Sequence, residues 1–554
     1  MRYRNEECAA VPRRRPASSG VRRWSRSIAA LLFGGVLGWS PPAFSQPAAG
    51  PIVWVTDGMQ RVAPHGPPGR DRHIHIYAAR GEYEPFQIVV RAPAGGLARV
   101  SLRWGGLRTR DGREIGAEHL TLYREHYVAI AQGSANWLRD QPSPPGAMRN
   151  EPDGPGIYAE PLIPFRDPET GHDLRGARLD AVPFRVAAGR NQPIWVDVFV
   201  PRDARPGAYH GRLRVTSAEG EAAVGVTLHV WNFELPRAPS LRSDFGFWNA
   251  KDEASAREMV RHRLMPREVK PEWLGRLVEQ GLNGISLDFW SRLDLAACER
   301  GSPVPLPAPS VAKVRAAVRA HGGVPFKHAY FADEIDDCRS DATVAAAVRR
   351  FARRLQRGGA TPLLTTYPFD EFWIDGPYIW ALSPHGFTDP AGLDRARAHG
   401  QELWSYNAVY LDNYSPKWLL DYPAVNFRLQ PGFISQSMGL TGLLYWAVDY
   451  WREGAEWAAP TAFGAAWPGE GVLTYPGSWV GVEGVVPGLR LKWIREGVED
   501  FEYVELLKRR GEAGFALEQA RLVGKSFAEW SRSAEAVYAV RRRLGERLHE
   551  LSSE

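Results

Sequence analysis

From Ser243 to about residue 480, short apolar runs alternate with amphipathic segments, and this alternation constrains the fold more than any other feature of the sequence. Helices are expected between the runs, for example over residues 311–320 and 341–355. The candidate strands are residues 245–248, 284–289, 326–332, 363–367, 378–382, 402–407 and 442–447. Repeated strand–helix units favour a parallel (β/α) barrel of the TIM type. An open doubly wound sheet is the alternative, but no Gly-rich phosphate loop follows a strand.

The regions on either side of this barrel have different patterns. Residues 52–235 contain short alternating strands broken by Gly and Pro, a pattern typical of a β-sandwich. After residue 480, two apolar stripes at helical spacing, over residues 494–507 and 537–551, predict helices that pack on the barrel. We therefore expect a multidomain β and α/β protein. Its predicted parts are a β-sandwich over 46–238, a barrel over 239–480 and a C-terminal helical segment over 481–554.

The first 45 residues are predicted to be a cleaved export signal. An Arg-rich stretch precedes an apolar run over residues 28–39, and the small-x-small sequence 43–45 follows it, so cleavage is expected after Ser45. The protein is then periplasmic or extracellular, with no membrane span, because the apolar run is shorter than the roughly 20 residues that a span needs.

The basic character of the whole chain comes from this leader. The formal net charge is +6, and residues 1–45 hold eight Arg and two Glu, so the remainder is close to neutral. A neutral chain gives no electrostatic reason to expect nucleic acid as a partner.

Cysteine and histidine usage limits the expected redox and metal chemistry. Once Cys8 leaves with the leader, Cys298 and Cys338 are the only thiols, and they form either a disulfide or two separate buried thiols. His73 and His75 share one face of a strand and could hold a metal, but no third ligand stands at a suitable spacing. We expect neither a metal nor a cofactor.

Two adjacent carboxylates, Asp333 and Glu334, end the apolar strand that begins at Phe326. The carboxyl ends of barrel strands form the active-site face, and hydrolysis of a glycosidic bond needs a carboxylic acid. Two close carboxylates also raise the pKa of one of them. The alternative is a helix N-cap followed by first-turn acids. A rival pair, Asp370 and Glu371, has neighbours that suggest a packed loop.

Aromatic and acidic residues near other strand ends are candidate sugar-binding residues. Rings there could form the floor of a sugar subsite, although core packing explains most single aromatic residues. A carboxylate between Val448 and Tyr450 is costly to bury without a partner. The candidates are Asp288, Trp290, Tyr367, Trp404, Tyr406, Trp446, Asp449 and Trp451.

Several blocks, in order along nearly the whole chain after the leader, resemble glycoside hydrolase family 123. They are residues 79–90 (ARGEYEPFQIVV), the strand ending at Asp333 and Glu334, residues 402–406 (ELWSY), 443–451 (LLYWAVDYW) and 489–503 (LRLKWIREGVEDFEY). The resemblance implies an N-terminal β-sandwich, a central barrel and retaining β-N-acetylgalactosaminidase chemistry in which the substrate's 2-acetamido group is the nucleophile. It further implies that Asp333 holds the acetamide N–H and that Glu334 is the acid and then the base.

The chain departs from the family pattern at two positions. Ile335 follows the acidic pair where Pro is common, and Gly432 follows Pro431 where relatives tend to carry Trp. Two other functions therefore stay open. One is a glycosidase for a sugar without an acetamido group, with Asp449 or Asp288 as a separate nucleophile. The other is a carbohydrate-binding or cell-surface protein without activity, because a fold alone does not fix function.

Overall fold

The computed structural model describes residues 50–135, 143–174, 176–301, 306–409, 412–452 and 454–553. The predicted export signal lies outside these residues. From Ala48 to Glu554 the chain forms one compact unit. The predicted divisions near residues 239 and 481 stay predictions.

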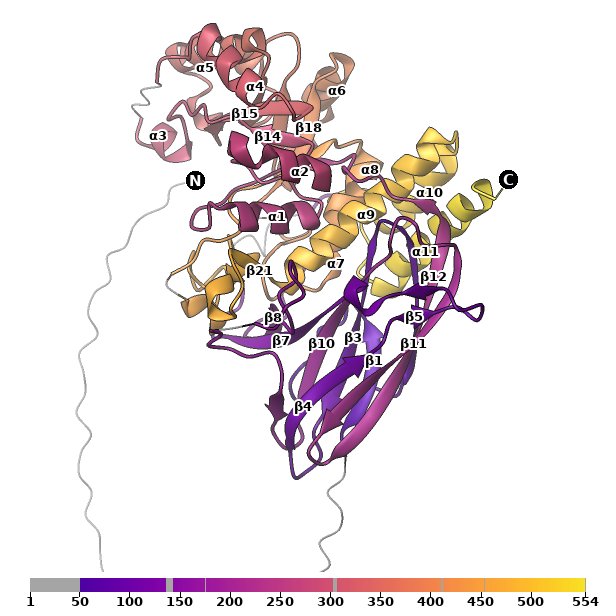
Figure 1. Cartoon of the computed structure of the whole chain (residues 1–554). Coiled ribbons are helices and arrows are strands. Elements are labelled where there is room, and N and C mark those ends of the chain that lie inside the picture. Colours follow the sequence, from indigo (N-terminus) through magenta and orange to yellow (C-terminus); the bar gives the residue numbers. More distant parts are fainter. Residues whose placement is uncertain are drawn as a thin grey trace, which may run out of the picture. The chain divides into compact units, whose positions relative to one another are not determined.

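Two β-sheets make up the N-terminal region (Figure 1). The first is antiparallel, in the order β1 (Ile52–Asp57), β3 (Tyr83–Arg91), β10 (Asn191–Phe199), β7 (Leu120–Ile130) and β8 (Gly156–Pro164). The second has the order β2 (His73–Arg80), β12 (Gly220–Glu234), β11 (Gly207–Ser217), β4 (Leu97–Trp104) and β9 (Phe184–Val186), with the short strands β5 (Leu107–Arg108) and β6 (Glu114–Ile115) beside it. Alternate side chains of both sheets, such as Ile88, Val196, Val226 and Leu228, share one buried core.

A third, entirely parallel sheet contains seven strands, six of which overlap the predicted ones closely, whereas the first shares only Phe245 with the predicted strand 245–248. The order is β13 (Arg242–Phe245), β19 (Gly442–Tyr445), β18 (Glu402–Asn407), β17 (Ile379–Leu382), β16 (Thr361–Thr365), β15 (Phe326–Asp333) and β14 (Gly284–Ser286). The helices between them are α1 (Glu253–Arg261), α2 (Leu274–Gln280), α3 (Leu295–Glu299), α4 (Val311–Ala320), α5 (Ala342–Gly358), α6 (Pro390–Ala398), α7 (Val425–Leu429) and α8 (Ser435–Met438). The hairpin β20 (Thr474–Pro476) and β21 (Val485–Pro487) follows β19.

This sheet curls into a nearly closed barrel, and one short segment lies in the gap between β13 and β14. Phe245 donates its N–H to the carbonyl of Met265 (3.0 Å) and accepts from the N–H of Arg267 (2.9 Å). On the other side, Ser286 of β14 donates to the carbonyl of Arg267 (3.1 Å). Residues 265–267 thus connect the two edge strands.

The C-terminal helices are α9 (Leu489–Arg509), α10 (Ala513–Val523) and α11 (Ala534–Leu551). The predicted apolar stripe lies on α9, but this helix also buries many charged side chains. Three of the buried cations have distant counter-ions: Arg490 binds Glu160 of β8, and both Lys492 and Arg495 bind Asp197 of β10. Helix α9 therefore joins the N-terminal sheets to the barrel through buried ion pairs.

Gly432 lies where the segment 430–434 packs against α9. A Cβ at this position would stand 2.9 Å from the carbonyl oxygen of Gly497 and 3.1 Å from the Cβ of Asp500. At Gly432, where the chain departs from the family pattern, the backbone thus packs so closely against α9 that a larger side chain has no room. Ile335, the other departure, is fully buried.

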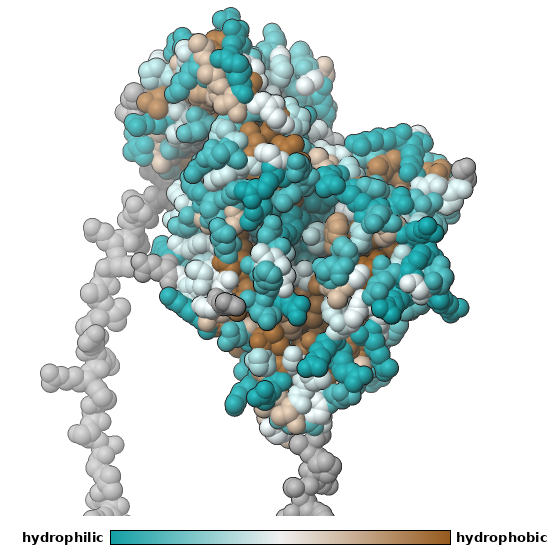
Figure 2. Space-filling view, in the orientation of Figure 1, coloured by the Kyte–Doolittle hydropathy of each residue, from teal (hydrophilic) through white to brown (hydrophobic). Residues whose placement is uncertain are grey.

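On the face shown in Figure 2, hydrophilic residues predominate and hydrophobic ones reach the surface in scattered patches. Among the described residues, no helix combines the length and the apolar character needed to cross a membrane.

Candidate active site

A β-bulge in β15 decides where Asp333 points. The pairing register with β16 shifts between Tyr330 and Ala332, so that Asp333 lies opposite Thr365. Residues three apart on a regular strand face opposite sides. Here the hydroxyl of Tyr330 nevertheless donates a hydrogen bond to Oδ1 of Asp333, and the hydroxyl of Thr365 donates to the same oxygen (2.6 Å). The bulge thus brings Asp333 to the barrel interior at the carboxyl end of the sheet.

Glu334 turns the chain immediately after the strand. Its φ is +50°, in the left-handed region that non-glycine residues seldom adopt. The backbone N–H of Glu334 holds this turn by donating to the carbonyl (3.0 Å) and the hydroxyl (2.8 Å) of Thr365. The Glu334 carboxyl is hydrogen-bonded to Tyr406, the side chain near the end of β18. The bulge and the turn together allow adjacent carboxyls to be presented at one place.

The two carboxyls have unlike environments. Burial, with a further contribution from the charge of Asp333, raises the pKa of Glu334 to about 7. Burial also raises the pKa of Asp333, but its two hydroxyl donors and the Arg267 guanidinium oppose that rise. Asp333 has two hydroxyl donors and a nearby guanidinium that favour its charged form, whereas Glu334 has one hydroxyl, so we expect a proton shared by the pair to lie on Glu334.

A buried network of charged side chains lies next to the Tyr330 ring, which binds Asp333. The Arg267 guanidinium lies 4.9 Å from the centre of the Tyr330 ring and bonds to Asp244. Asp244 also binds Nε2 of His328 at 2.8 Å, inside the barrel. Sequence reasoning missed these residues, because Arg267 belongs to the short segment between β13 and β14 and its partners lie far away along the chain.

The structure gathers four predicted sugar-binding residues at this end of the barrel. Tyr406 contacts Glu334, and Trp446 packs against the same cluster of inward-facing side chains as Tyr406. The Trp290 ring meets the Tyr330 ring edge to face, with their centroids 5.7 Å apart. Asp288 is exposed on the loop that carries Trp290.

Two of the predicted sugar-binding residues have buried side chains that already contact other groups. Trp404 fills the barrel interior two residues before Tyr406, against the space that Gly442 leaves, and has no surface exposure. Asp449 is also buried, and its carboxylate accepts the backbone N–H groups of Trp248 (2.7 Å), Asn249 (2.9 Å) and Ala250 (2.6 Å). Asp449 therefore fixes the loop after β13, and its buried, hydrogen-bonded carboxylate is poorly placed to act as a nucleophile.

Two further candidate sugar-binding residues, Tyr367 and Trp451, form hydrogen bonds to backbone groups. The Tyr367 hydroxyl accepts from the N–H of Gly392 (2.8 Å), at the start of α6, and donates to the carbonyl of Asp389. The Trp451 indole donates to the carbonyl of Thr474 (2.8 Å) and packs in a separate apolar cluster with Trp457. In the rival pair, Asp370 forms an ion pair with Arg395 at the surface.

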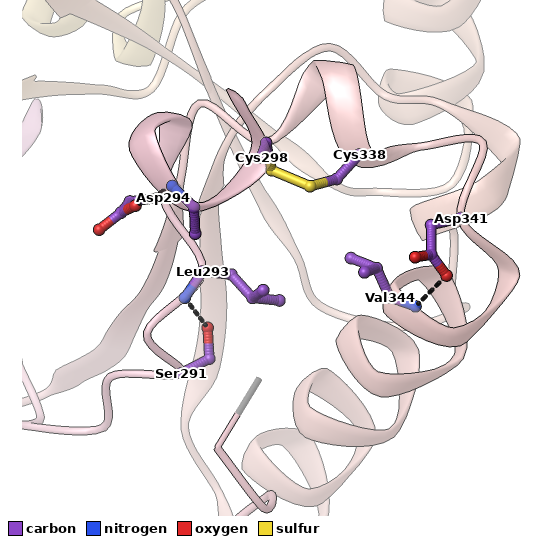
Figure 3. Close-up of a disulfide and its surroundings, with 8 residues drawn as sticks. Ser291, Leu293, Asp294, Cys298, Cys338, Asp341 and Val344 are labelled. Atoms are coloured by element: carbon purple, nitrogen blue, oxygen red, sulfur yellow. Dashed lines mark hydrogen bonds between the residues drawn. A yellow bond between two sulfur atoms is a disulfide. The ribbon is translucent and has the colours of Figure 1, made fainter. Parts of the chain in front are cut away.

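Cys298 and Cys338 form a disulfide (Figure 3). Cys298 lies on α3, after β14, and Cys338 lies in the turn after Glu334, with 5.3 Å between their Cα atoms. The bond thus ties together two loops that flank the acidic pair. In the described part of the chain, no group of three or more His, Cys, Asp or Glu side chains is arranged to hold a metal ion.

Family comparisons match two stretches of the chain. The glycoside hydrolase 123 N-terminal domain matches residues 67–217, and the glycoside hydrolase 123 catalytic domain matches residues 335–507, so the two together cover more than half of the sequence. The chain belongs to glycoside hydrolase family 123. It is therefore a glycoside hydrolase. The catalytic-domain match begins directly after Glu334, and so it includes Tyr406 and Trp446 but not the acidic pair.

A solved structure shows the same fold. The family 123 glycoside hydrolase from Clostridium perfringens, described as acting in glycolipid glycan hydrolysis, matches with a TM-score of 0.56 and 11% sequence identity, over 91% of this chain and 98% of that one. A β-D-glucuronidase from Dictyoglomus thermophilum has a TM-score of only 0.28 at 10% identity, over 76% of this chain and 68% of its own, which is too low to indicate a shared overall fold. A search of curated proteins finds no match.

The hydrogen bond from Tyr406 gives a prediction for this family 123 enzyme. That bond lowers the pKa of Glu334 against the effect of burial, so Tyr406→Phe should raise this pKa further. If Glu334 acts as a protonated acid, kcat/KM falls as the pH rises through its pKa. We expect the alkaline limb of the pH profile to move upward by about one unit in Tyr406→Phe. Tyr367→Phe is the matched control, because the Tyr367 hydroxyl binds the start of α6, and its profile should not move. An unchanged or lowered limb in Tyr406→Phe would contradict the assignment.

Proposed function

We propose that this enzyme is an exported, retaining β-N-acetylhexosaminidase of the N-acetylgalactosaminidase type, which uses the 2-acetamido group of its substrate as the nucleophile. The glycan of a glycolipid is the substrate class that we propose, by analogy with the solved relative. We further propose that the catalytic domain is a TIM-type barrel with residues 265–267 as a reduced strand, and that the two N-terminal sheets are a β-sandwich.

The observation that carries this proposal is the unequal environment of two adjacent carboxyls. Glu334, with a pKa of about 7, keeps a proton that it can give to the leaving oxygen. Asp333 presents a carboxylate whose Oδ1 already accepts two hydroxyl groups, so Oδ2 is the oxygen that would bind a ligand. An acetamide N–H at C2 lies next to the glycosidic oxygen at C1, which suits two acceptors on neighbouring residues. Asp333 would hold the acetamide and stabilise the positive oxazolinium that it becomes.

The main alternative needs a separate carboxylate nucleophile for a sugar without an acetamido group. The three backbone N–H groups on Asp449 argue against that residue in this role. Asp288 has no such engagement, and so the choice between the two mechanisms needs a chemical test.

That test compares aryl β-glycosides of N-acetylgalactosamine, N-acetylglucosamine, galactose and glucose, followed by inhibition with a thiazoline analogue of the better acetamido sugar. We expect turnover of acetamido sugars alone and tight inhibition, because the thiazoline resembles the cyclised intermediate. Turnover of galactose or glucose without thiazoline inhibition would favour Asp288 and overturn the proposal. An absence of any turnover would favour a protein that binds glycans without cleaving them.

A further inference from the structure

Aromatic side chains form an exposed wall beside the candidate active site. Among the described residues, the exposed large hydrophobic side chains that are aromatic are Trp248, Trp290 and Phe463, with exposed fractions of 57%, 37% and 42%. Trp248 follows β13 and Trp290 follows β14, both at the barrel end that carries Asp333 and Glu334. Phe463 lies 5.5 Å, centroid to centroid, from Trp446, the residue after β19. All three exposed rings therefore lie around the mouth of the barrel.

On the β13 and β19 side, the rings make one continuous surface, which we call the aromatic wall: Trp248, Trp446, Tyr450 and Phe463. Trp248 meets Trp446 (5.7 Å) and Tyr450 (5.5 Å) edge to face. Trp446 in turn packs against Tyr450 at 5.1 Å. More than half of Trp248 stays exposed despite these contacts. Such a surface favours a ligand with an apolar face and a polar rim.

The wall is held rigidly by buried carboxylates. Asp449 accepts the backbone N–H of Trp248 together with the next two N–H groups of the chain. The Trp446 indole N–H donates to Glu470, which is itself buried. A rigid surface loses little conformational entropy when it binds a ligand. This gives Asp449 a positioning role in place of the direct sugar contact that the sequence suggested.

The wall continues into the acidic site. Trp446 packs on the inward-facing cluster that contains Tyr406, and Tyr406 bonds to Glu334. Trp290 stands on the other side of Asp333, against Tyr330. A glycan whose terminal bond lies at Glu334 would thus have its next sugar beside aromatic rings.

We infer that the aromatic wall binds a second sugar ring of the substrate glycan, next to the sugar that is cleaved, so that the enzyme recognises an oligosaccharide. This inference rests on the proposed function. Sugar rings expose C–H faces that pack on aromatic faces, and their hydroxyls remain in water at the rim. Trp248 and Phe463, as the most exposed members, are the residues that would contact that sugar.

The test compares two substrates with the same terminal sugar, the methyl β-glycoside of N-acetylgalactosamine and a trisaccharide that ends in β-linked N-acetylgalactosamine. In Trp248→Ala and Phe463→Ala, kcat/KM for the trisaccharide should fall on the order of tenfold in each variant, whereas the methyl glycoside should stay within about twofold. Leu522→Ala is the matched control, since Leu522 is equally exposed (58%) but lies on α10. Equal losses on both substrates, or no loss on either, would overturn the inference.

A binding measurement tests this inference independently of the proposed function. Calorimetric titration of the trisaccharide into the Glu334→Gln enzyme measures recognition without turnover. If Trp248→Ala weakens binding in that background and leaves the circular dichroism spectrum like that of Glu334→Gln alone, the aromatic wall contacts the trisaccharide. This conclusion holds even if the wild type cleaves neither substrate. Unchanged binding would contradict the wall whatever the activity results show.

Discussion

In Glu334→Gln, kcat on substrates with poor leaving groups is expected to fall by a factor on the order of 10² to 10⁴, because the substitution removes the transferable proton and keeps the shape of the side chain. The carboxyl that is lost is half-buried and hydrogen-bonded to Tyr406 after a left-handed backbone turn, so the amide should occupy the same position. The variant should also lose the alkaline limb of the pH profile, since no group of pKa about 7 remains at this position.

A series of leaving groups makes this result specific to acid catalysis. Aryl glycosides of acidic phenols need little protonation, and so they should retain much more of the wild-type rate in Glu334→Gln. The matched control is Glu371→Gln in the rival acidic pair after β16, which should leave the activity unchanged. Similar losses on all leaving groups would show that Glu334 is not the acid.

Asp197→Ala is expected to lower the free energy of unfolding by about 3–5 kcal/mol, because it removes the carboxylate that pairs with the buried Lys492 and leaves the buried Arg495 with Glu496 alone. Asp197 is itself buried, and it accepts from Lys492 (2.7 Å), from both terminal nitrogens of Arg495 (2.9 and 3.0 Å) and from the Trp195 indole (2.7 Å). Burial opposes its ionisation, but Arg495 and Lys492 more than compensate and hold its pKa below the ordinary value. The contribution is therefore present at neutral pH and is lost as the pH falls through the lowered pKa.

Urea unfolding at pH 7 tests this prediction against an exposed ion pair in the N-terminal sheets. Glu221 pairs with Arg214 at the surface, with about 60% of each side chain exposed, and its replacement by Ala should cost at most about 1 kcal/mol. Asp197→Ala should unfold at clearly lower urea than Glu221→Ala. Coincident unfolding curves would mean that the buried pairs of α9 do not hold the N-terminal sheets to the rest of the chain.

Features set by local sequence were predictable. Six of the seven parallel strands lie on predicted apolar runs, and β18 (Glu402–Asn407) was predicted with its observed ends. The exception is β13 (Arg242–Phe245), whose sequence RSDF is mostly polar and which shares only Phe245 with the predicted run. The left-handed turn at Glu334 has no such signal, because Glu has no preference for that conformation and the contacts with Thr365 that hold it come from another strand. Residues 265–267 were also missed, since a three-residue segment containing Pro266 gives no strand pattern.

The burial of Trp404 and Asp449 could not be predicted, for one shared reason. Along β18 the side chains of Trp404 and Tyr406 face the same barrel interior, but only Tyr406 is near the mouth, and depth inside a barrel does not show in the sequence. The partners of Asp449 are backbone groups about 200 residues away. Likewise, α9 has the charge content of an exposed helix. Only the folded chain brings Glu160 to Arg490, and Asp197 to Lys492 and Arg495.

The central claim is that Asp333 and Glu334 divide the chemistry between the acetamide and the leaving oxygen. The most direct measurement is the dependence of rate on leaving-group pKa for aryl N-acetylgalactosaminides, in the wild type, Glu334→Gln and Asp333→Asn. We expect a steep dependence for Glu334→Gln, which lacks the proton, and a dependence close to that of the wild type for Asp333→Asn, slowed on every substrate because the oxazolinium loses its carboxylate. Equal slopes for the two variants, or full activity in either, would contradict the account.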